Sequence, residues 1–333
     1  MSDLGVVAIG RNEGERLRRC LVSLAEQAPG SPIVYVDSGS TDGSVAMARG
    51  LGVDVVELDL SIPFTAARAR NEGFARLEQS DTHRYVQFID GDCEVAPGWL
   101  DRARAELDSR PDVVAVCGRR RERFPDQSVY NRLIDMEWDT PVGEADACGG
   151  DVLVRADTFR QIGGYNPGMI AGEDPEMCIR LRKAAGGKIL RIDAEMTLHD
   201  AALTQLGQWW KRLVRAGHAY AESAAMYGYR HDLHTTRQIV LYGIINTLLV
   251  LILAWPAWPL SLLLAMLFPL KIAIATIREI KAGRPPRLAL IHSTGVVMAI
   301  LPMGVGFWMY WSHRIQGRAS TLIEYKNPVN AAV

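Results

Sequence analysis

The chain has 333 residues, a formal net charge of −1 and 48% hydrophobic residues. The near-neutral balance argues against a general nucleic-acid binder, because such a protein carries a strong basic excess. Its five cysteines are scattered without paired metal-ligand spacing, which argues against a disulfide framework or a zinc site. The mean hydropathy of +0.02 averages two unlike parts. Charged residues are frequent up to about Arg237 and nearly vanish over long stretches beyond it.

The first half of the chain alternates short apolar runs with segments of helical periodicity. Strands are predicted at residues 4–9, 33–36, 53–58, 85–89 and 113–116, and helices at 17–24, 45–51, 64–77 and 99–107. Strands and helices that take turns predict an α/β fold with a mostly parallel sheet and helices on both faces. No Gly-x-Gly-x-x-Gly motif follows the first strand, which weakens a dinucleotide-binding interpretation.

Two carboxylates one residue apart, Asp90 and Asp92, leave the end of the predicted strand 85–89. Ligands of open α/β sheets bind outside the carboxyl ends of the strands. An extended chain through Gly91 would place both carboxylates on one side. Paired hard oxygen ligands at such a place suit Mg²⁺ or Mn²⁺. The alternative is an acidic strand-to-turn junction, since Asp and Gly are common turn residues.

Three apolar runs, at residues 239–255, 257–277 and 288–311, predict membrane-spanning helices. Each is near the roughly 20 residues that cross a bilayer, and Trp and Tyr residues stand at their ends. A set of buried helices in a soluble protein is the alternative. The basic loop 278–287 is expected in the cytoplasm. A third span would put the basic tail outside, which leaves open that one run is re-entrant or interfacial.

Several motifs follow one another along the first two-thirds of the chain. They are Arg11-Asn12-Glu13 after the first strand, the acidic glycine-rich loop 37–44, Ala69-Arg70-Asn71-Glu72-Gly73, Asp90-Gly91-Asp92, Gly149-Gly150, Gly172-Glu173-Asp174 and His199. No single motif is specific, but their types and order together resemble the inverting family 2 glycosyltransferases with a GT-A fold.

The resemblance implies a GT-A nucleotide-sugar-binding domain at residues 1–205, joined to the C-terminal transmembrane helices. Residues 206–237 are expected to form an amphipathic interfacial helix and linker, 238–312 the membrane region of two to three segments, and 313–333 a tail. The expected location is the inner (cytoplasmic) membrane, with several spans and the catalytic domain in the cytoplasm.

The resemblance also assigns the donor and metal residues. Asp92 is the expected first ligand of Mn²⁺ or Mg²⁺, with Asp90 nearer the ribose or a metal-bound water. His199 would complete the metal shell, and an ordinary polar residue near a strand end is its alternative.

Further donor-binding residues are expected along the first half of the chain. Asn12, Glu13 and Asn71 belong to this set by resemblance. Asp37 would contact the nucleobase, or alternatively form a turn before Ser-Gly-Ser. Arg70 would bind the diphosphate, with a solvated helix face as its alternative.

On the acceptor side, the resemblance implies a general base at Asp174, an acceptor contact at Glu173 and an acceptor loop at Gly149 and Gly150. The base would take the proton of an acceptor hydroxyl as that oxygen attacks the anomeric carbon. Asp174 also has the pattern of a helix N-cap, because Pro175 suits the first helical position.

Two further segments carry cations. The basic run 118–123 would meet a phosphate or lipid headgroups, or be a solvated surface. The segment 208–215 combines Trp with Lys and Arg, as interfacial helices do. Processive relatives carry Gln-x-x-Arg-Trp in a comparable region, whereas Lys211 and Arg212 stand here. This departure favours a single sugar transfer over polymer synthesis.

The sequence thus predicts a metal-dependent inverting glycosyltransferase. It would move a sugar from a nucleotide-sugar, UDP-sugar by family habit, to a lipid-linked or envelope glycan acceptor at the cytoplasmic membrane face. The nearest alternative is a polyprenyl-phosphate sugar synthase, which needs no base. A nucleotidyltransferase would show a glycine- and lysine-rich loop after the first strand. A nucleotide-sugar-binding scaffold without activity is the non-enzyme alternative.

Overall fold

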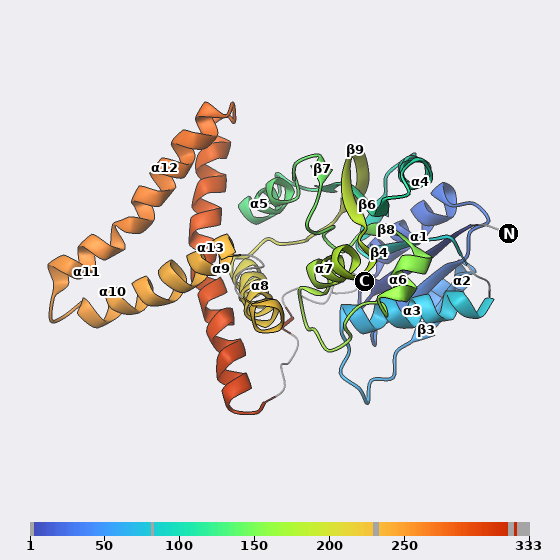
Figure 1. Cartoon of the computed structure of the whole chain (residues 1–333), viewed down its shortest axis with the longest axis horizontal. Coiled ribbons are helices and arrows are strands. Elements are labelled where there is room, and N and C mark those ends of the chain that lie inside the picture. The colour runs from blue at the N-terminus through green and yellow to red at the C-terminus, as the bar shows by residue number, and fades with distance from the viewer. Residues whose placement is uncertain (1–2, 81–82, 229–232, 319–322, 325–333) are drawn as a thin grey trace.

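An α/β domain and a helical C-terminal part make up the protein, and the computed structural model describes residues 3–80, 83–228, 233–318 and 323–324. Figure 1 shows the two parts side by side, with the sheet on the right and the long apolar helices on the left. The described strands are β1 (Leu4–Gly10), β2 (Ile33–Asp37), β3 (Asp54–Glu57), β4 (Tyr85–Asp90), β5 (Cys93–Val95), β6 (Val113–Glu122), β7 (Gly143–Glu144), β8 (Val152–Arg155) and β9 (Lys188–His199).

These strands form one sheet in the order β3-β2-β1-β4-β8-β6-β9-β5, with β7 paired to β9. Strands β1 to β4 run parallel to one another, and β6 runs parallel to β9. By contrast, β8 runs antiparallel to β4 and β6, and β5 and β7 run antiparallel to β9. The predicted α/β fold is confirmed, and the sheet as a whole is mixed. Apolar runs reveal that strands exist but do not set their direction, which depends on the connections.

The helices of the α/β domain are α1 (Glu15–Gln27), α2 (Ser44–Gly50), α3 (Ala66–Ser80), α4 (Trp99–Ser109), α5 (Val129–Glu137), α6 (Ala156–Gln161) and α7 (Glu173–Ala185). Helix α1 shows why they form. Leu17, Cys20, Leu21 and Leu24 recur at the spacing of one helix face, and all four are buried. The burial of that face holds α1 on the domain.

Strand β4 lies inside the sheet, and both of its faces are covered. Tyr85, Val86, Phe88 and Ile89 are fully buried, as expected for a near-continuous apolar run in a central strand. Gln87 is the buried polar exception, and its side-chain oxygen accepts a hydrogen bond from the Trp99 indole N–H at 3.0 Å. The strand therefore delivers Asp90, at its carboxyl end, to a fixed place.

The C-terminal part consists of α8 (Leu206–Tyr227), α9 (Leu233–Gln238), the π-helical segment η1 (Ile239–Asn246), α10 (Thr247–Leu253), α11 (Trp258–Ala265), α12 (Leu267–Lys281) and α13 (Pro286–Ile315). Among the described residues, three helical stretches are long and apolar enough to cross a membrane: Leu233–Leu253, Trp258–Lys281 and Pro286–Ile315. They coincide with the three predicted apolar runs. Trp255 and Trp258 lie at the exposed turn between the first two stretches.

Close packing of α3 on the sheet depends on Gly73. A Cβ at this position would lie 2.4 Å from Val7 Cγ1 and 2.9 Å from Val36 Cγ2. We expect Gly73→Ala to lower the melting temperature of the detergent-purified protein by roughly 3–10 °C, because overpacking typically costs about 1–3 kcal/mol. Gly50→Ala, at the end of α2, is the matched control because its Cβ would meet nothing within 4 Å. Equal melting temperatures for the two variants would contradict this packing.

Candidate active site

A cavity of about 1250 Å³ opens at the carboxyl ends of β1 and β4 and reaches across to the C-terminal helices. Most of the predicted site residues line it. They are Asn12, Glu13, Arg70, Asp90, Asp92, Gly149, Gly150, Glu173, Asp174 and His199. The sheet brings them together because the strands that carry or precede them end at one side of the domain.

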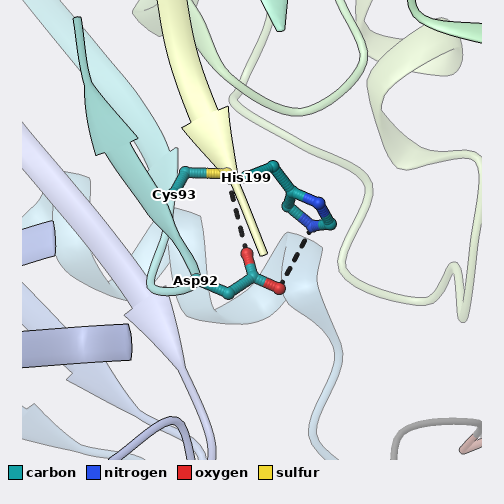
Figure 2. Close-up of side chains that lie close together, drawn as sticks. All are labelled: Asp92, Cys93 and His199. Atoms are coloured by element: carbon teal, nitrogen blue, oxygen red, sulfur yellow. Dashed lines mark hydrogen bonds and ion pairs between the residues drawn. The ribbon is translucent and has the colours of Figure 1, made fainter. Parts of the chain in front are cut away.

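Asp92 and His199 face each other at one end of the cavity (Figure 2). The Asp92 Oδ2 atom lies 3.2 Å from His199 Nε2, and both side chains are buried. The sheet sets this pairing, because Cys93, next to Asp92, stands opposite His199 in the β5–β9 register. The structure thus brings together two predicted metal ligands that lie more than 100 residues apart in the chain.

Glu122 supports the histidine from behind. Its Oε2 lies 3.4 Å from His199 Nδ1, and it also accepts a hydrogen bond from the Ala201 backbone N–H at 3.0 Å. If a cation lay between Asp92 and His199, the carboxylate on Nδ1 would hold the ring proton there and the Nε2 lone pair would meet the cation. This is the arrangement of a histidine prepared to bind a cation through Nε2.

The donor set fits a hard divalent cation. Asp92, Cys93 and His199 place their ligand atoms within 4.8 Å of one another. Burial raises the pKa of Cys93 well above its usual value, so its thiol stays protonated and donates to Asp92 Oδ1 at 3.6 Å. Carboxylate oxygen and neutral imidazole then remain as ligands, together with oxygens from a substrate. Such a set suits Mn²⁺ or Mg²⁺ rather than a thiolate-preferring metal.

Asp90 occupies a different environment, between two buried arginines. Arg70 Nη2 lies 2.7 Å from Asp90 Oδ1, and Arg120 Nη2 lies 3.5 Å from Asp90 Oδ2. Both carboxylate oxygens therefore face guanidinium groups. Direct coordination of a metal by Asp90 stays a prediction, because its oxygens are already paired with two arginines.

Asp151 fixes this arrangement from below and was missed by the sequence analysis. It is fully buried, forms an ion pair with Arg120 at 2.8 Å and accepts a hydrogen bond from the Asp90 backbone N–H at 3.0 Å. Its second oxygen also accepts from the Thr197 hydroxyl at 2.7 Å. In the sequence, Asp151 directly follows Gly149-Gly150. That position could have drawn attention to it, but no local pattern indicates that the side chain is buried.

Arg70 links Asp90 at the end of β4 to Glu173 at the start of α7. Its Nη1 donates to Glu173 Oε1 at 2.8 Å, while Nη2 holds Asp90. Burial alone would lower the pKa of Arg70, but Asp90, Tyr165 and Glu173 outweigh it and raise that pKa above its ordinary value. The guanidinium therefore stays charged, and the predicted solvated helix face is wrong because the side chain is only 2% exposed.

Asp174 lies in the first turn of α7, with its carboxylate turned to the glycine loop. Its Oδ2 accepts hydrogen bonds from the backbone N–H groups of Cys148 at 3.0 Å and Gly149 at 2.8 Å. The helix is capped instead by Gly172 in a left-handed conformation, so the N-cap interpretation of Asp174 is wrong. Burial raises the pKa of Asp174, although the two backbone donors oppose that rise.

Asp37 and Asn71 are not among the residues that line the cavity. Asp37 accepts hydrogen bonds from the Tyr35 hydroxyl and from the backbone N–H groups of Gly39 and Ser40. Asn71 exchanges two hydrogen bonds with the Tyr165 backbone. Both side chains thus shape loops beside the cavity, and their direct contact with a donor stays a prediction.

The basic run 118–123 is part of strand β6 rather than an open cationic surface. Arg119 and Arg120 are buried. Arg119 pairs with Asp135 at 3.3 Å, Arg121 pairs with Glu195 at 2.8 Å, and Arg123 pairs with Glu94. The alternative of a solvated surface is therefore wrong for Arg119 and Arg120. Strand β6 continues beyond the apolar residues 113–116, and this extension carries both arginines into the interior.

The end of the cavity at α8 and α13 has many apolar lining residues, with Arg212 and His292 beside them. Helix α8 contributes Trp209, Leu213 and Ala216, and α13 contributes Val296, Ile300 and Met303. Arg215 of α8 also lines this end and is half-buried. One continuous space therefore joins a charged end, suited to phosphate and metal, to an end built from the apolar C-terminal helices.

Comparison with known proteins agrees with this geometry. Residues 6–162 match the model of the family described as Glycosyl transferase family 2. The α/β domain is thus similar to the family 2 glycosyltransferases in sequence over this range, and it has the GT-A fold. The match includes Asp92 and ends before Asp174 and His199.

Individual relatives cover more of the chain. A pre-mycofactocin glycosyltransferase of Mycobacterium tuberculosis is 27% identical over 84% of this chain and 57% of its own length. A TPR repeat-containing protein of Synechococcus elongatus is 31% identical over 40% of this chain and 31% of its own length. The chain thus spans little more than half the length of the first of these curated relatives.

A solved structure extends the likeness in fold. The mannosyltransferase PcManGT from Pyrobaculum calidifontis, in complex with GDP-Man and Mn²⁺, aligns with a TM-score of 0.54 and 17% identity. The alignment covers 95% of this chain and 87% of that protein. At this identity the likeness concerns the fold of the chain.

The charge on Arg70 should be important for stability. We expect Arg70→Met to destabilise the protein by about 3 kcal/mol, because it leaves Asp90 and Glu173 without their shared buried counter-ion. Arg76→Met on the same helix removes an exposed pair with Asp54 and should leave the melting temperature nearly unchanged. Thermal unfolding of both variants in detergent measures the difference. Similar melting temperatures would show that Arg70 does not hold the two carboxylates.

Proposed function

We propose that this protein is an inverting glycosyltransferase that moves one sugar from a nucleotide-sugar to a lipid-linked or envelope glycan acceptor. The single observation that carries the proposal is the continuous cavity. It joins the Asp92–His199 pair, the buried carboxylate of Asp174 and an apolar wall of α8 and α13. A charged donor and an apolar acceptor can meet only in a space that has both kinds of lining.

The donor diphosphate is placed at the charged end of the cavity. Asp92 and His199 would hold Mn²⁺ or Mg²⁺, which neutralises the charge that develops on the leaving phosphate oxygens. Arg70 lines the same end, so its guanidinium is within the space that a diphosphate would occupy. UDP-sugars are the proposed donors, and GDP-mannose, the ligand of the Pyrobaculum calidifontis structure, is the first competitor to test.

Asp174 is the proposed general base. An acceptor hydroxyl oxygen forms a bond to the anomeric carbon, and the nucleoside diphosphate leaves with the bonding electron pair. The hydroxyl proton passes to Asp174. One displacement of this kind inverts the anomeric centre. A raised pKa suits the role, because a more basic carboxylate takes a proton more readily.

The apolar end of the cavity supports an acceptor with a hydrophobic part. Trp209, Leu213, Ile300 and Met303 would contact the first isoprenoid or acyl units of a lipid carrier. The bulk of the lipid would stay in the bilayer beside the three apolar helical stretches. The α/β domain is proposed to lie in the cytoplasm, where nucleotide-sugars are available, and the protein in the inner membrane.

Donor hydrolysis in the absence of acceptor tests the transferase directly. We expect detergent-purified protein to release one nucleoside diphosphate from a panel of UDP-, GDP- and other nucleotide-sugars when Mn²⁺ or Mg²⁺ is present. EDTA and Asp92→Asn should each abolish that release, whereas Asp112→Asn on the domain surface should not. Calorimetric titration of Mn²⁺ with the matching nucleotide provides a second readout. Failure of both hydrolysis and binding would overturn the proposal, whereas binding without hydrolysis or transfer would favour a nucleotide-sugar-binding scaffold.

Removal of the base should reveal the acceptor class. We expect Asp174→Asn to lower the transfer rate by about 10²–10⁴-fold, while donor binding persists. The wild-type rate should fall as the pH drops through the raised pKa of Asp174, because the protonated carboxyl group cannot accept a proton. Asp101→Asn, an exposed first-turn carboxylate on α4, is the control. Full activity of Asp174→Asn would instead favour a polyprenyl-phosphate acceptor, which is already ionised.

A further inference from the structure

Helix α13 contacts the α/β domain near its beginning. Gly295, in the third turn of α13, lies so close to Leu133 of α5 that a Cβ would come within 2.4 Å of Leu133 Cδ2. Helix α5 in turn packs on strand β6 of the sheet. The first third of α13 is therefore held directly on the catalytic side.

The middle of α13 is packed against α8 through glycines. A Cβ on Gly306 would lie 1.8 Å from the Val214 carbonyl oxygen, and a Cβ on Gly217 would lie 2.0 Å from the Met303 carbonyl oxygen. Backbones this close leave no room for a slide of one helix past the other. Because α8 follows the α/β domain directly in the chain, it holds α13 along the edge of that domain (Figure 1).

The chain beyond α13 also returns to the catalytic side. Glu324 Oε1 lies 2.6 Å from Arg11 Nη1, and both residues line the cavity. Arg11 belongs to the loop after β1. Only eight residues separate Glu324 from the end of α13 at Ile315, which favours a position of that helix end on the side of the sheet.

The two faces of α13 differ in what they meet. His292, Val296, Ala299 and Met303 line the cavity. On the opposite face, Leu290, Val305, Trp308 and Ile315 are 45–83% exposed and recur at spacings close to whole helical turns. An exposed apolar stripe of this kind requires a partner, and a lipid surface fits it.

Basic residues occur at both ends of α13, which agrees with a position of both ends on the same side of the membrane. Arg284 and Arg287 stand at its beginning, and Arg314 and Arg318 at its end. The positive-inside rule places both groups on the cytoplasmic side. By contrast, the α10–α12 hairpin reaches away from the sheet in Figure 1, and Trp255 at its tip is 93% exposed.

We infer that α13 does not cross the bilayer, although it is long and apolar enough to do so. It lies along the membrane surface on the side of the α/β domain, with its Leu290–Val305–Trp308–Ile315 stripe in the lipid. The α9–α10 and α11–α12 stretches form a two-span hairpin whose turn lies on the far side. A full crossing by α13 would carry one of its ends about 30 Å from the α/β domain, whereas α5 contacts α13 near its beginning and Glu324, beyond its end, pairs with Arg11. This inference does not rest on the proposed catalytic activity.

Labelling from the two sides of the membrane tests the inference. The five native cysteines are buried, so a single exposed cysteine can be introduced into the full chain. We expect Gln316→Cys and Ser109→Cys to react with a membrane-impermeant maleimide only in inverted vesicles, and Trp255→Cys only in intact spheroplasts. Ser109 is an exposed position on α4 and reports the side of the α/β domain. Labelling of Gln316→Cys together with Trp255→Cys in spheroplasts would overturn the inference, as would labelling of Trp255→Cys from the domain side.

Depth measurement separates a surface helix from a span independently of accessibility. Spin labels at Leu290→Cys, Val305→Cys and Ile315→Cys, in protein reconstituted into lipid nanodiscs, should show similar shallow depths by oxygen-dependent power saturation. A crossing helix would instead place Val305 deep and the two other labels near opposite headgroups. That second pattern would overturn the surface position of α13.

Discussion

The charge balance around Asp90 is the constraint on which the site depends. Its carboxylate lies between Arg70 and Arg120, and each arginine passes on to another acid, Glu173 or Asp151. Isolated buried charges are very costly, so the guanidinium groups can stay in the interior only while these acids surround them. The network therefore locks α3, β4, β6 and α7 together at the floor of the cavity. Asp92 and Asp174 adjoin this network, and their own carboxylates are held by His199 and by the backbone N–H groups of the glycine loop.

The membrane part depends on a different physical interaction, the contact of backbone with backbone. Gly217 of α8 and Gly306 of α13 allow an approach that no larger residue permits. Such contacts need no hydrophobic driving force between helices and therefore persist where lipid is the solvent. They make α8 and α13 a rigid wall for the apolar end of the cavity. The two helices also connect the sheet to the α10–α12 hairpin, so the position of the α/β domain relative to the apolar hairpin is fixed.

The periodicity of apolar residues and the order of the motifs predicted most of the strands and most of the site residues, but they missed buried charged residues that support the site. Apolar runs located β1 to β4 and the first part of β6, because a run of buried apolar residues leaves a local signature, but they missed the short strand β5. The Asp92–His199 meeting was expected only by resemblance, since two residues from β4–β5 and β9 meet through sheet register. Asp151 was not predicted as a site residue, and Arg120 and Glu122 were expected only as part of the basic run 118–123. A buried charge looks like any other charge in a sequence, and its partner is set by tertiary contacts that no local pattern contains.

The division of the cavity also explains where resemblance to the family ends. The family match stops at residue 162 and contains the charged end of the cavity, with Asp90 and Asp92. A sugar nucleoside diphosphate leaves a diphosphate, so on the proposed function the same charge would be neutralised whatever sugar is transferred. Acceptors share no such group, and the elements at the other end of the cavity are α7, α8 and α13. On the proposed function, acceptor choice would therefore depend on the part of the chain whose packing, rather than its motifs, defines the cavity.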